Sequence, residues 1–293
     1  MNYQFNPVFF LKISFNFRII IYFITKNILI LNNSLLKEKL DFHYKAFDKS
    51  QISPDPLQFL HFYKDVKDIE IVGFISSVFA YGNVRQIIST LNSIFNVLGE
   101  HPYSFIKNLD RKHLKDYFGK TIHRFYTSQD IKLFFIELNS VINKEGTLKN
   151  LFLKYYLKNE NDKNLKIPLS EFSNYFISST LKKYKEITPG CRFMFADPLT
   201  GSACKRMNLF LRWMIRKDDL DFGLWTDISA DKLIIPVDTH VARICRELKL
   251  TKRKNVSWKM AEEITENLKK FDPIDPVKYD FAICHIGMRK MIF

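Results

Sequence analysis

Lys205 lies where a nucleophile could act. The run ADPLTGSACKRMNLFLRWM places a turn of Gly201, Ser202 and Ala203 directly before a stretch with helical spacing. The first turn of a helix presents unpaired N–H groups and a partial positive charge, which together bind phosphate. Lys205 stands in that turn beside Arg206, and positive surroundings favour the neutral amine that a nucleophile needs. We therefore predict a phosphate-binding turn followed by a reactive lysine, with an ordinary helix start and a solvated lysine as the alternative.

Asp238 is the second residue that could do chemistry. It follows Pro236 in PVDTHVARICREL and precedes a helix with apolar positions at Val241 and Ile244. An Asp at this place is a good N-cap, because its side chain accepts hydrogen bonds from N–H groups of the first turn. A carboxylate fixed at a helix start can also stabilise positive charge nearby. The roles of helix cap and catalytic group are therefore compatible.

Together the two segments resemble the helix-hairpin-helix DNA glycosylase superfamily. In its endonuclease III branch the hairpin reads approximately L-P-G-x-G-x-K-T-A, and a V-D-T-H-I-x-R segment carries the catalytic Asp. GSACK matches the hairpin, with Gly201 and Ala203 at the glycine positions and Lys205 at the lysine, and PVDTHVARIC matches the second segment with Asp238. The resemblance implies that the protein binds double-stranded DNA, that Lys205 attacks the sugar and that Asp238 stabilises the cationic sugar.

Weaker similarity to the superfamily extends over about 68–289. The run EIVGFISSVFAYGNVRQI resembles an early buried helix and the loop after it that carries a DNA wedge, and YDFAICHIGMR resembles the helix before the iron–sulfur loop. The resemblance makes Tyr81 and Asn83 wedge candidates, with simple packing as an equal alternative for Tyr81. DPLQF, AYGN, SACKR, FLRWM and PVDTHVAR are also similar to a bacterial domain of unknown function of the DUF2400 type, which implies no activity.

Three features depart from the glycosylase pattern. Ala203 replaces the second hairpin glycine, which weakens phosphate contact. Between Lys205 and Asp238 lie 32 residues, a spacing closer to the archaeal 8-oxoguanine glycosylase branch than to endonuclease III. No four-cysteine cluster follows residue 289. We therefore expect no iron–sulfur cluster, no metal and no small-molecule cofactor.

The elements that must position these residues are predicted to be helices. The chain is 46% hydrophobic and holds 28 Phe against only 9 Gly and 10 Pro, which favours helices joined by short loops. Apolar residues recur with helical spacing almost throughout after residue 34. We expect an all-α, two-lobed helical bundle of the helix-hairpin-helix glycosylase type. A single domain over 34–293 should form it, with Lys205 and Asp238 facing the cleft between the lobes.

Periodicity and helix-capping residues place the individual helices. Asp68 is expected to cap a helix that runs to about Phe79 and is buried on every side, since it has hardly any polar face. The longest irregular segment is predicted at 187–205. Other helices are expected near 34–47, 84–98, 128–143, 147–158, 170–185, 206–216, 241–250 and 258–271.

The chain is strongly basic, with 45 Lys and Arg against 31 Asp and Glu and a net charge of +14. Such a surplus is typical of a surface that meets a polyanion, but it is equally explained by solubility or by the codon usage of an AT-rich genome. Arg212 and Arg216 are four residues apart and share a helix face, which predicts contact with a phosphate backbone or a solvated stripe. Trp213 and Trp225 are expected in the core.

The four cysteines are scattered without a C-x-x-C pair, which indicates neither a zinc ribbon nor a disulfide framework and favours a cytoplasmic protein. Residues 1–33 are apolar, yet Lys12, Arg18 and Lys26 cut them into runs shorter than the roughly 20 residues of a spanning helix. A secretory signal also fits poorly. We interpret 1–33 as an extension upstream of the true start, with a weak membrane anchor as the alternative.

The sequence therefore supports two functional hypotheses. The first is a monomeric DNA glycosylase with AP-lyase activity, and the second is a non-catalytic DNA-binding protein that keeps the glycosylase fold. The presence of both Lys205 and Asp238 favours the enzyme, since a binding module has no need of that pair. A third hypothesis, a membrane-associated helical protein, depends only on residues 1–33.

Overall fold

The computed structural model describes residues 33–46 and 48–289. The only β-type pairing in these ranges consists of two isolated bridges, His123–Tyr126 and Lys217–Phe222, so the prediction of an all-α protein is confirmed. No helix of the described ranges is long and apolar enough to cross a bilayer. The interpretation of the N-terminal extension falls on residues 1–32, which lie outside the described residues.

Twelve labelled α-helices follow a first helix at 33–46, and most of them match segments with predicted helical spacing. The first six are α2 (Val66–Phe79), α3 (Val84–Leu98), α4 (Pro102–Lys107), α5 (Leu114–Phe118), α6 (Ser128–Glu145) and α7 (Leu148–Tyr156). The other six are α8 (Lys166–Tyr184), α9 (Pro189–Met194), α10 (Lys205–Ile215), α11 (Thr239–Glu247), α12 (Trp258–Leu268) and α13 (Asp280–Arg289). The short helices α4, α5 and α9 were not predicted from the sequence.

Helix α2 is the central helix of the fold. Every residue from Asp68 to Phe79 is buried, which confirms the prediction of a helix without a polar face. The predicted cap, however, was wrong. Asp65 caps α2 by accepting hydrogen bonds from the N–H groups of Lys67 (2.8 Å) and Asp68 (3.2 Å), so the helix begins three residues earlier than expected.

Two buried carboxylates of α2 accept hydrogen bonds from N–H groups at the starts of neighbouring helices. Asp68 accepts a hydrogen bond from the N–H of Tyr103 in the first turn of α4 (2.7 Å). Glu70 accepts from the N–H groups of Leu148 (2.8 Å) and Lys149 (3.0 Å) at the start of α7, and from Trp225 Nε1 (2.9 Å). Burial raises the pKa of Glu70, while these three donors act in the opposite direction. The acidic residues of α2 thus fix the helix starts packed around it.

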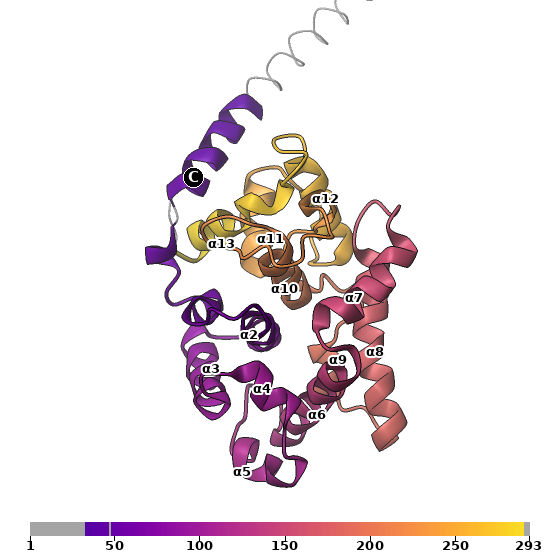
Figure 1. The fold of residues 1–293 in the computed structure, drawn as a ribbon. Helices are drawn as coiled ribbons and strands as arrows, with labels where there is room; N and C mark the ends of the chain where they lie inside the picture. Colours follow the sequence, from indigo (N-terminus) through magenta and orange to yellow (C-terminus); the bar gives the residue numbers. More distant parts are fainter. Residues whose placement is uncertain (1–32, 47, 290–293) are drawn as a thin grey trace, which may run out of the picture.

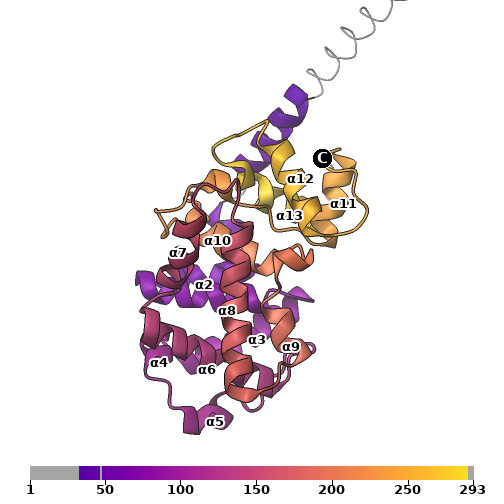
Figure 2. The ribbon, with the colours of Figure 1, turned by 90° about the vertical axis from the view of Figure 1, so that its right-hand side faces the viewer.

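Figures 1 and 2 show how the remaining helices surround this centre. Helix α10 packs directly against α2. The C-terminal helices α11, α12 and α13 gather at one end of the molecule, while α3 to α6 lie toward the other end (Figures 1 and 2). Trp213 of α10 and Trp225 are each 1% exposed, which confirms that both belong to the core. Helix α10 therefore lies between the two groups of helices, and its first residue is Lys205.

The far end of α10 is held by buried ion pairs. Arg212 contacts Asp221 (3.0 Å) and Asp280 (2.5 Å), and Arg216 contacts Asp221 and Asp275 (2.8 Å). The two arginines are 2% and 3% exposed, so the prediction of a DNA-facing or solvated stripe is wrong. Their shared helix face points into the protein, where carboxylates from α13 and the loops around it compensate the buried charge.

Candidate active site

Lys205 is the first residue of α10 and follows a turn in which two residues have a left-handed backbone conformation. Gly201 has φ +92°, and Cys204 has φ +46° and occupies the N-cap position without making a side-chain cap. Ser202 Oγ accepts a hydrogen bond from the N–H of Cys204 (3.2 Å) and tightens the turn. A Cβ at Gly201 would meet no atom within 4 Å, so the backbone conformation, not lack of space, calls for glycine here.

Asp238 caps α11, as predicted. Its Oδ1 accepts hydrogen bonds from the N–H groups of His240 (2.9 Å) and Val241 (3.0 Å). The segment before it, 233–237, is buried and non-helical, and it brings Asp238 to the start of α11. The cap fixes the orientation of the carboxylate and leaves its second oxygen, Oδ2, to interact with another group.

The second oxygen of Asp238 meets Lys205. Lys205 Nζ lies 2.6 Å from Asp238 Oδ2, although 32 residues separate the two in the sequence. The side chains are 30% and 25% exposed, so the pair is accessible from solvent without being fully hydrated. Two helix starts thus bring a primary amine and a carboxylate into direct contact at the surface.

The electrostatics of Lys205 differ from the sequence-based prediction. Burial alone would lower the pKa of Lys205, but the negative charges around it, the Asp238 carboxylate foremost, act in the opposite direction, and the pKa is raised above that of an ordinary lysine. Burial alone would raise the pKa of Asp238, but the ammonium group of Lys205 and the hydrogen bond from the N–H of Val241 act in the opposite direction, and the pKa is lowered. The prediction of a neutral amine was wrong, because it considered only the helix dipole and Arg206. The pair rests as ammonium and carboxylate.

Helix α13 supplies the third side of the site. It packs against α11, and the Asp280 carboxylate lies near enough to Lys205 to raise its pKa further. Asp280 is buried and ion-paired with Arg212 (2.5 Å). Burial raises the pKa of the Cys284 thiol, so this cysteine rests as the neutral thiol. No local pattern near Lys205 could indicate this contribution, since α13 lies more than 70 residues beyond Lys205.

The turn residues predicted to contact DNA divide into two groups. Gly201 is exposed and Ser202 is half-buried, so both lie at the surface beside Lys205. Ala203 is 7% exposed, and its carbonyl accepts a hydrogen bond from Asn208 Nδ2 (3.1 Å). The methyl group of Ala203 therefore faces the protein, and only the backbone of this residue could meet a phosphate.

Arg206 does not face solvent, in contrast to the prediction that it contacts DNA. It is 7% exposed, donates hydrogen bonds to the hydroxyl of Tyr126 and the carbonyl of Phe193, and lies 4.0 Å from the centroid of the Phe193 ring. Burial lowers the pKa of Arg206, and Tyr126 counteracts that effect. Arg206 holds the start of α10 against α9 and the end of α2.

The two predicted wedge residues lie in the loop between α2 and α3. Tyr81 is half-buried and packs edge-to-face against Phe193 (4.6 Å between centroids) and Phe125 (5.5 Å). Asn83 is exposed, but its Oδ1 accepts a hydrogen bond from the N–H of Arg85 (2.9 Å) and caps α3. Packing therefore accounts for Tyr81 and capping for Asn83.

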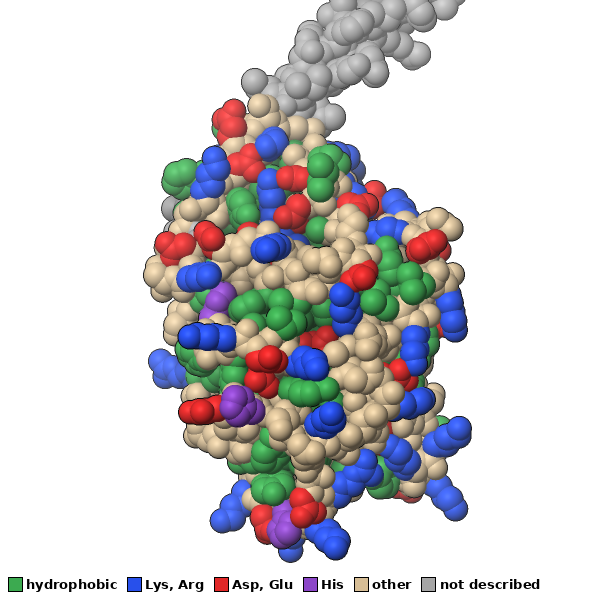
Figure 3. Space-filling model, in the orientation of Figure 1, with side chains coloured by type: hydrophobic (Ala, Val, Ile, Leu, Met, Phe, Trp, Pro, Cys, Tyr) green, Lys and Arg blue, Asp and Glu red, His purple; other side chains and the backbone are tan. Residues whose placement is uncertain are grey.

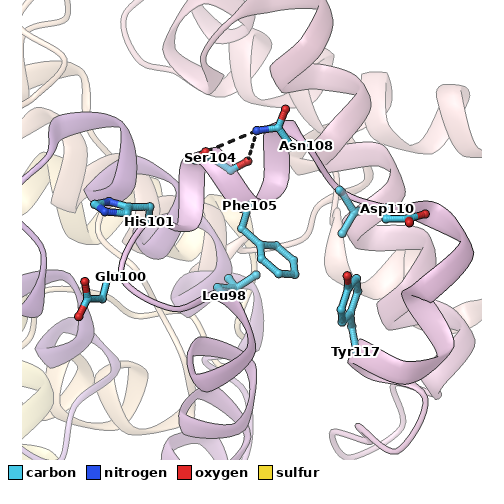
Figure 4. A pocket seen from close by; sticks show the side chains of 9 residues that line it. Leu98, Glu100, His101, Ser104, Phe105, Asn108, Asp110 and Tyr117 are labelled. Carbon is cyan, nitrogen blue, oxygen red and sulfur yellow. Dashed lines mark hydrogen bonds between the residues drawn. The ribbon is translucent and has the colours of Figure 1, made fainter.

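Other parts of the molecule offer less for chemistry. A cavity of about 440 Å³ lies between α3, α4 and α5, where the rings of Phe105 and Tyr117 are in contact and Glu100 and His101 line one side (Figure 4). It is far from the Lys205–Asp238 pair in the chain and in the fold. Within the described ranges, no group of His, Cys, Asp and Glu side chains could hold a metal ion.

Basic side chains are distributed widely over the surface. On the face drawn in Figure 3, Lys and Arg side chains lie over the whole outline, with Asp and Glu side chains among them. They are most numerous toward the lower right of this face, where few Asp and Glu side chains lie. Any preference for a polyanion must therefore depend on particular groups of unpaired cations and not on the net charge alone.

Comparison with known proteins identifies the family of the chain. No curated protein and no solved structure shows significant similarity to the chain. One family profile covers residues 55–289, which include every element from η2 (Pro56–Phe62) to α13 and both members of the Lys205–Asp238 pair. The chain therefore belongs to the family described as Protein of unknown function (DUF2400).

Proposed function

We propose that this protein is a DNA N-glycosylase with AP-lyase activity, in which Lys205 is the nucleophile and Asp238 stabilises the cationic sugar. The observation that carries the proposal is the contact of 2.6 Å between Lys205 Nζ and Asp238 Oδ2 at a partly exposed pair of helix starts. The fold that goes with the proposal is the two-lobed arrangement of helix-hairpin-helix glycosylases, with double-stranded DNA as the partner of a monomer.

Each half of the pair has a role in the proposed reaction. The damaged base leaves the stack and its sugar meets Lys205. As the bond between C1′ and the base breaks, the Lys205 ammonium gives one proton to the departing base, and the amine that results forms a bond to C1′. Asp238 meanwhile stabilises the positive charge on the sugar. Opening of the sugar ring gives a Schiff base, from which elimination breaks the 3′ C–O bond.

The cap explains how Asp238 can act in this way. Because Oδ1 accepts two backbone hydrogen bonds, the carboxylate cannot rotate freely, and Oδ2 stays directed at Lys205. A preorganised charge needs no rearrangement when the cationic sugar forms. No side chain caps α10, which begins after the Gly201 turn. The N–H groups in the first turn of α10 can therefore bind a phosphate of the DNA.

One observation favours the second hypothesis, a non-catalytic DNA-binding protein. The pKa of Lys205 is raised, so the resting residue is a cation that could simply bind phosphate. In the enzyme, by contrast, the proton must leave Lys205 during the reaction. The two hypotheses therefore differ in whether a covalent bond to the sugar ever forms.

A base-release assay tests the proposal. Purified protein is incubated with a panel of duplexes, each with one oxidised purine or pyrimidine, and the undamaged duplex serves as control. The proposal predicts release of at least one lesion with strand cleavage at that position. Tight binding to the duplexes with no release from any of them would instead support the non-catalytic hypothesis.

A further inference from the structure

We propose that the exposed face of α11 and the loop after it form a basic strip that binds the phosphates of one DNA strand next to the Lys205–Asp238 pair. The basic strip consists of Arg243, Arg246, Lys252 and Lys254. The inference depends on DNA being the partner in the proposed function, and it adds a contact surface separate from the Gly201 turn.

Charge is concentrated in this part of the chain. Residues 239–256 contain six Lys and Arg side chains and a single acidic one, Glu247, whereas the chain as a whole has 45 basic and 31 acidic residues. All four residues of the basic strip are exposed. A short segment thus carries a large share of the positive surplus to the surface.

Helix α11 separates its buried and exposed faces clearly. Its buried residues, Val241, Ala242, Ile244 and Cys245, pack into the core. Arg243 and Arg246 lie on the opposite side, where Arg243 also contacts Glu247 (2.9 Å). Asp238 caps the same helix, and Arg243, the first residue of the basic strip, follows it five positions later, about 7.5 Å farther along the helix axis.

The loop after α11 is held in place by several polar contacts. Arg246 Nη1 donates to the carbonyl of Lys254 (3.1 Å), which ties the loop to the helix. Glu263 of α12 accepts a hydrogen bond from the N–H of Lys252 (3.2 Å) and pairs with Arg253 (2.8 Å). The carboxylate of Glu263 is therefore committed to Arg253 and to the loop backbone. This arrangement preorganises the two lysines for binding.

The ammonium groups of Lys252 and Lys254 are the cations available to a ligand. Among the residues that the structure describes, no carboxylate lies within ion-pair distance of either one. At the end of the loop, the N–H of Trp258 donates to the carbonyl of Gly201 (3.0 Å). The loop therefore returns to the turn that precedes Lys205, and the basic strip and that turn border the same site.

The dimensions fit one strand of a duplex. Helix α11 has nine residues, which at about 1.5 Å per residue gives a length of roughly 13 Å. One DNA strand advances about 3.4 Å per nucleotide, so the helix extends alongside about four nucleotides. Lys and Arg side chains at such positions bind phosphates without reading the bases. The basic strip would thus orient the strand whose sugar meets Lys205.

The test measures the salt dependence of binding to a duplex with a stable abasic-site analogue, by fluorescence anisotropy. The variant is Lys252→Ala/Lys254→Ala. The matched control is Lys112→Ala/Lys115→Ala, which removes two exposed lysines beside α5, at the opposite end of the molecule (Figure 1). Thermal melting checks that both variants fold.

We expect the strip variant to reduce the slope of log affinity against log salt by about 1.8, since each phosphate contact contributes about 0.9. At 0.1 M salt this corresponds to roughly 60-fold weaker binding. The control should match the wild type. If the strip variant also matches the wild type while the wild type binds DNA and releases bases, the inference is wrong and the proposed function stands.

The reverse result separates the two claims. A strip variant with the expected loss of DNA binding, in a protein that releases no base, supports the basic strip and contradicts the proposed catalysis. Vesicles that contain phosphatidylserine provide a further comparison. Strip-dependent binding to these vesicles, without binding of the wild type to DNA, would assign the strip to a membrane surface and overturn the inference.

Discussion

The substitution Asp238→Asn separates the structural role of Asp238 from its proposed chemical role. Asn caps helices about as well as Asp, so the hydrogen bonds from the N–H groups of His240 and Val241 should persist. The ion pair with Lys205 is lost, but with side chains 30% and 25% exposed it contributes no more than about 1 kcal/mol. The free energy of unfolding should therefore change by about 1 kcal/mol or less.

The effect on chemistry should be much larger and should depend on the substrate. Without the carboxylate the cationic sugar loses its stabilisation, and base release should fall by about 10²–10³-fold. At the same time the pKa of Lys205 should fall, because Asp238 is the main group that raises it. On a duplex whose base is already absent, Asp238→Asn should therefore form the Schiff base at lower pH than the wild type.

The assay compares the two substrates side by side. One duplex carries the lesion and the other a pre-formed abasic site, and sodium borohydride captures the Schiff base on the second across a range of pH. Asp238→Ala is the control for the cap and should lower the free energy of unfolding by about 1 kcal/mol more than Asp238→Asn does, because it removes the cap as well as the ion pair. Undiminished base release by Asp238→Asn would refute the reasoning. So would a fall in Schiff-base formation on the abasic duplex as large as the fall in base release on the lesion duplex.

Three further predictions concern the electrostatics that hold the site. Arg212→Met should lower the free energy of unfolding by about 3–5 kcal/mol in urea denaturation, because Asp280 then stays buried without its partner and Asp221 keeps only Arg216, whereas Arg243→Met at the surface should change it by less than about 1 kcal/mol. Glu70→Gln should cost about 1–3 kcal/mol in the same measurement, since the amide cannot accept all three hydrogen bonds that the carboxylate accepts, and an unchanged midpoint would contradict this role. The pKa of Asp238 is lowered in the folded protein, so its ion pair stabilises the fold above about pH 3.9 and is lost as pH falls through the folded pKa. Urea titrations from pH 7 to pH 3 should show the difference between wild type and Asp238→Asn shrinking over that window, and a constant difference would argue against the ion pair.

Local patterns in the sequence were sufficient for much of the fold. The apolar run from Ile69 to Phe79 predicted the buried central helix, and Asp238 after Pro236 predicted a capped helix start. Short helices such as α4 and α9 have six residues each, too few for helical periodicity to be recognised in the sequence. Asp68, which the sequence predicted as the cap of α2, instead accepts a hydrogen bond from the N–H of Tyr103, a tertiary contact that the local sequence does not reveal.

The errors at the site have a common physical origin. The spacing of Arg212 and Arg216 showed that they share a helix face, but periodicity does not show whether that face meets solvent or carboxylates from distant segments. The pKa of Lys205 depends on a carboxylate 33 positions away in the sequence, and on α13 beyond it. Long-range charge pairs override local effects such as the helix dipole, which acts only within the first turn.

The most direct test of the central claim is covalent capture of the proposed nucleophile. The wild-type protein and Lys205→Met are incubated with sodium borohydride and a duplex with an abasic site, and mass spectrometry of the digested adduct identifies the modified residue. Our account predicts an adduct on Lys205 in the wild type and none in Lys205→Met, with DNA binding within a few fold of the wild type. An adduct that maps to another lysine, or that persists in Lys205→Met, would contradict it.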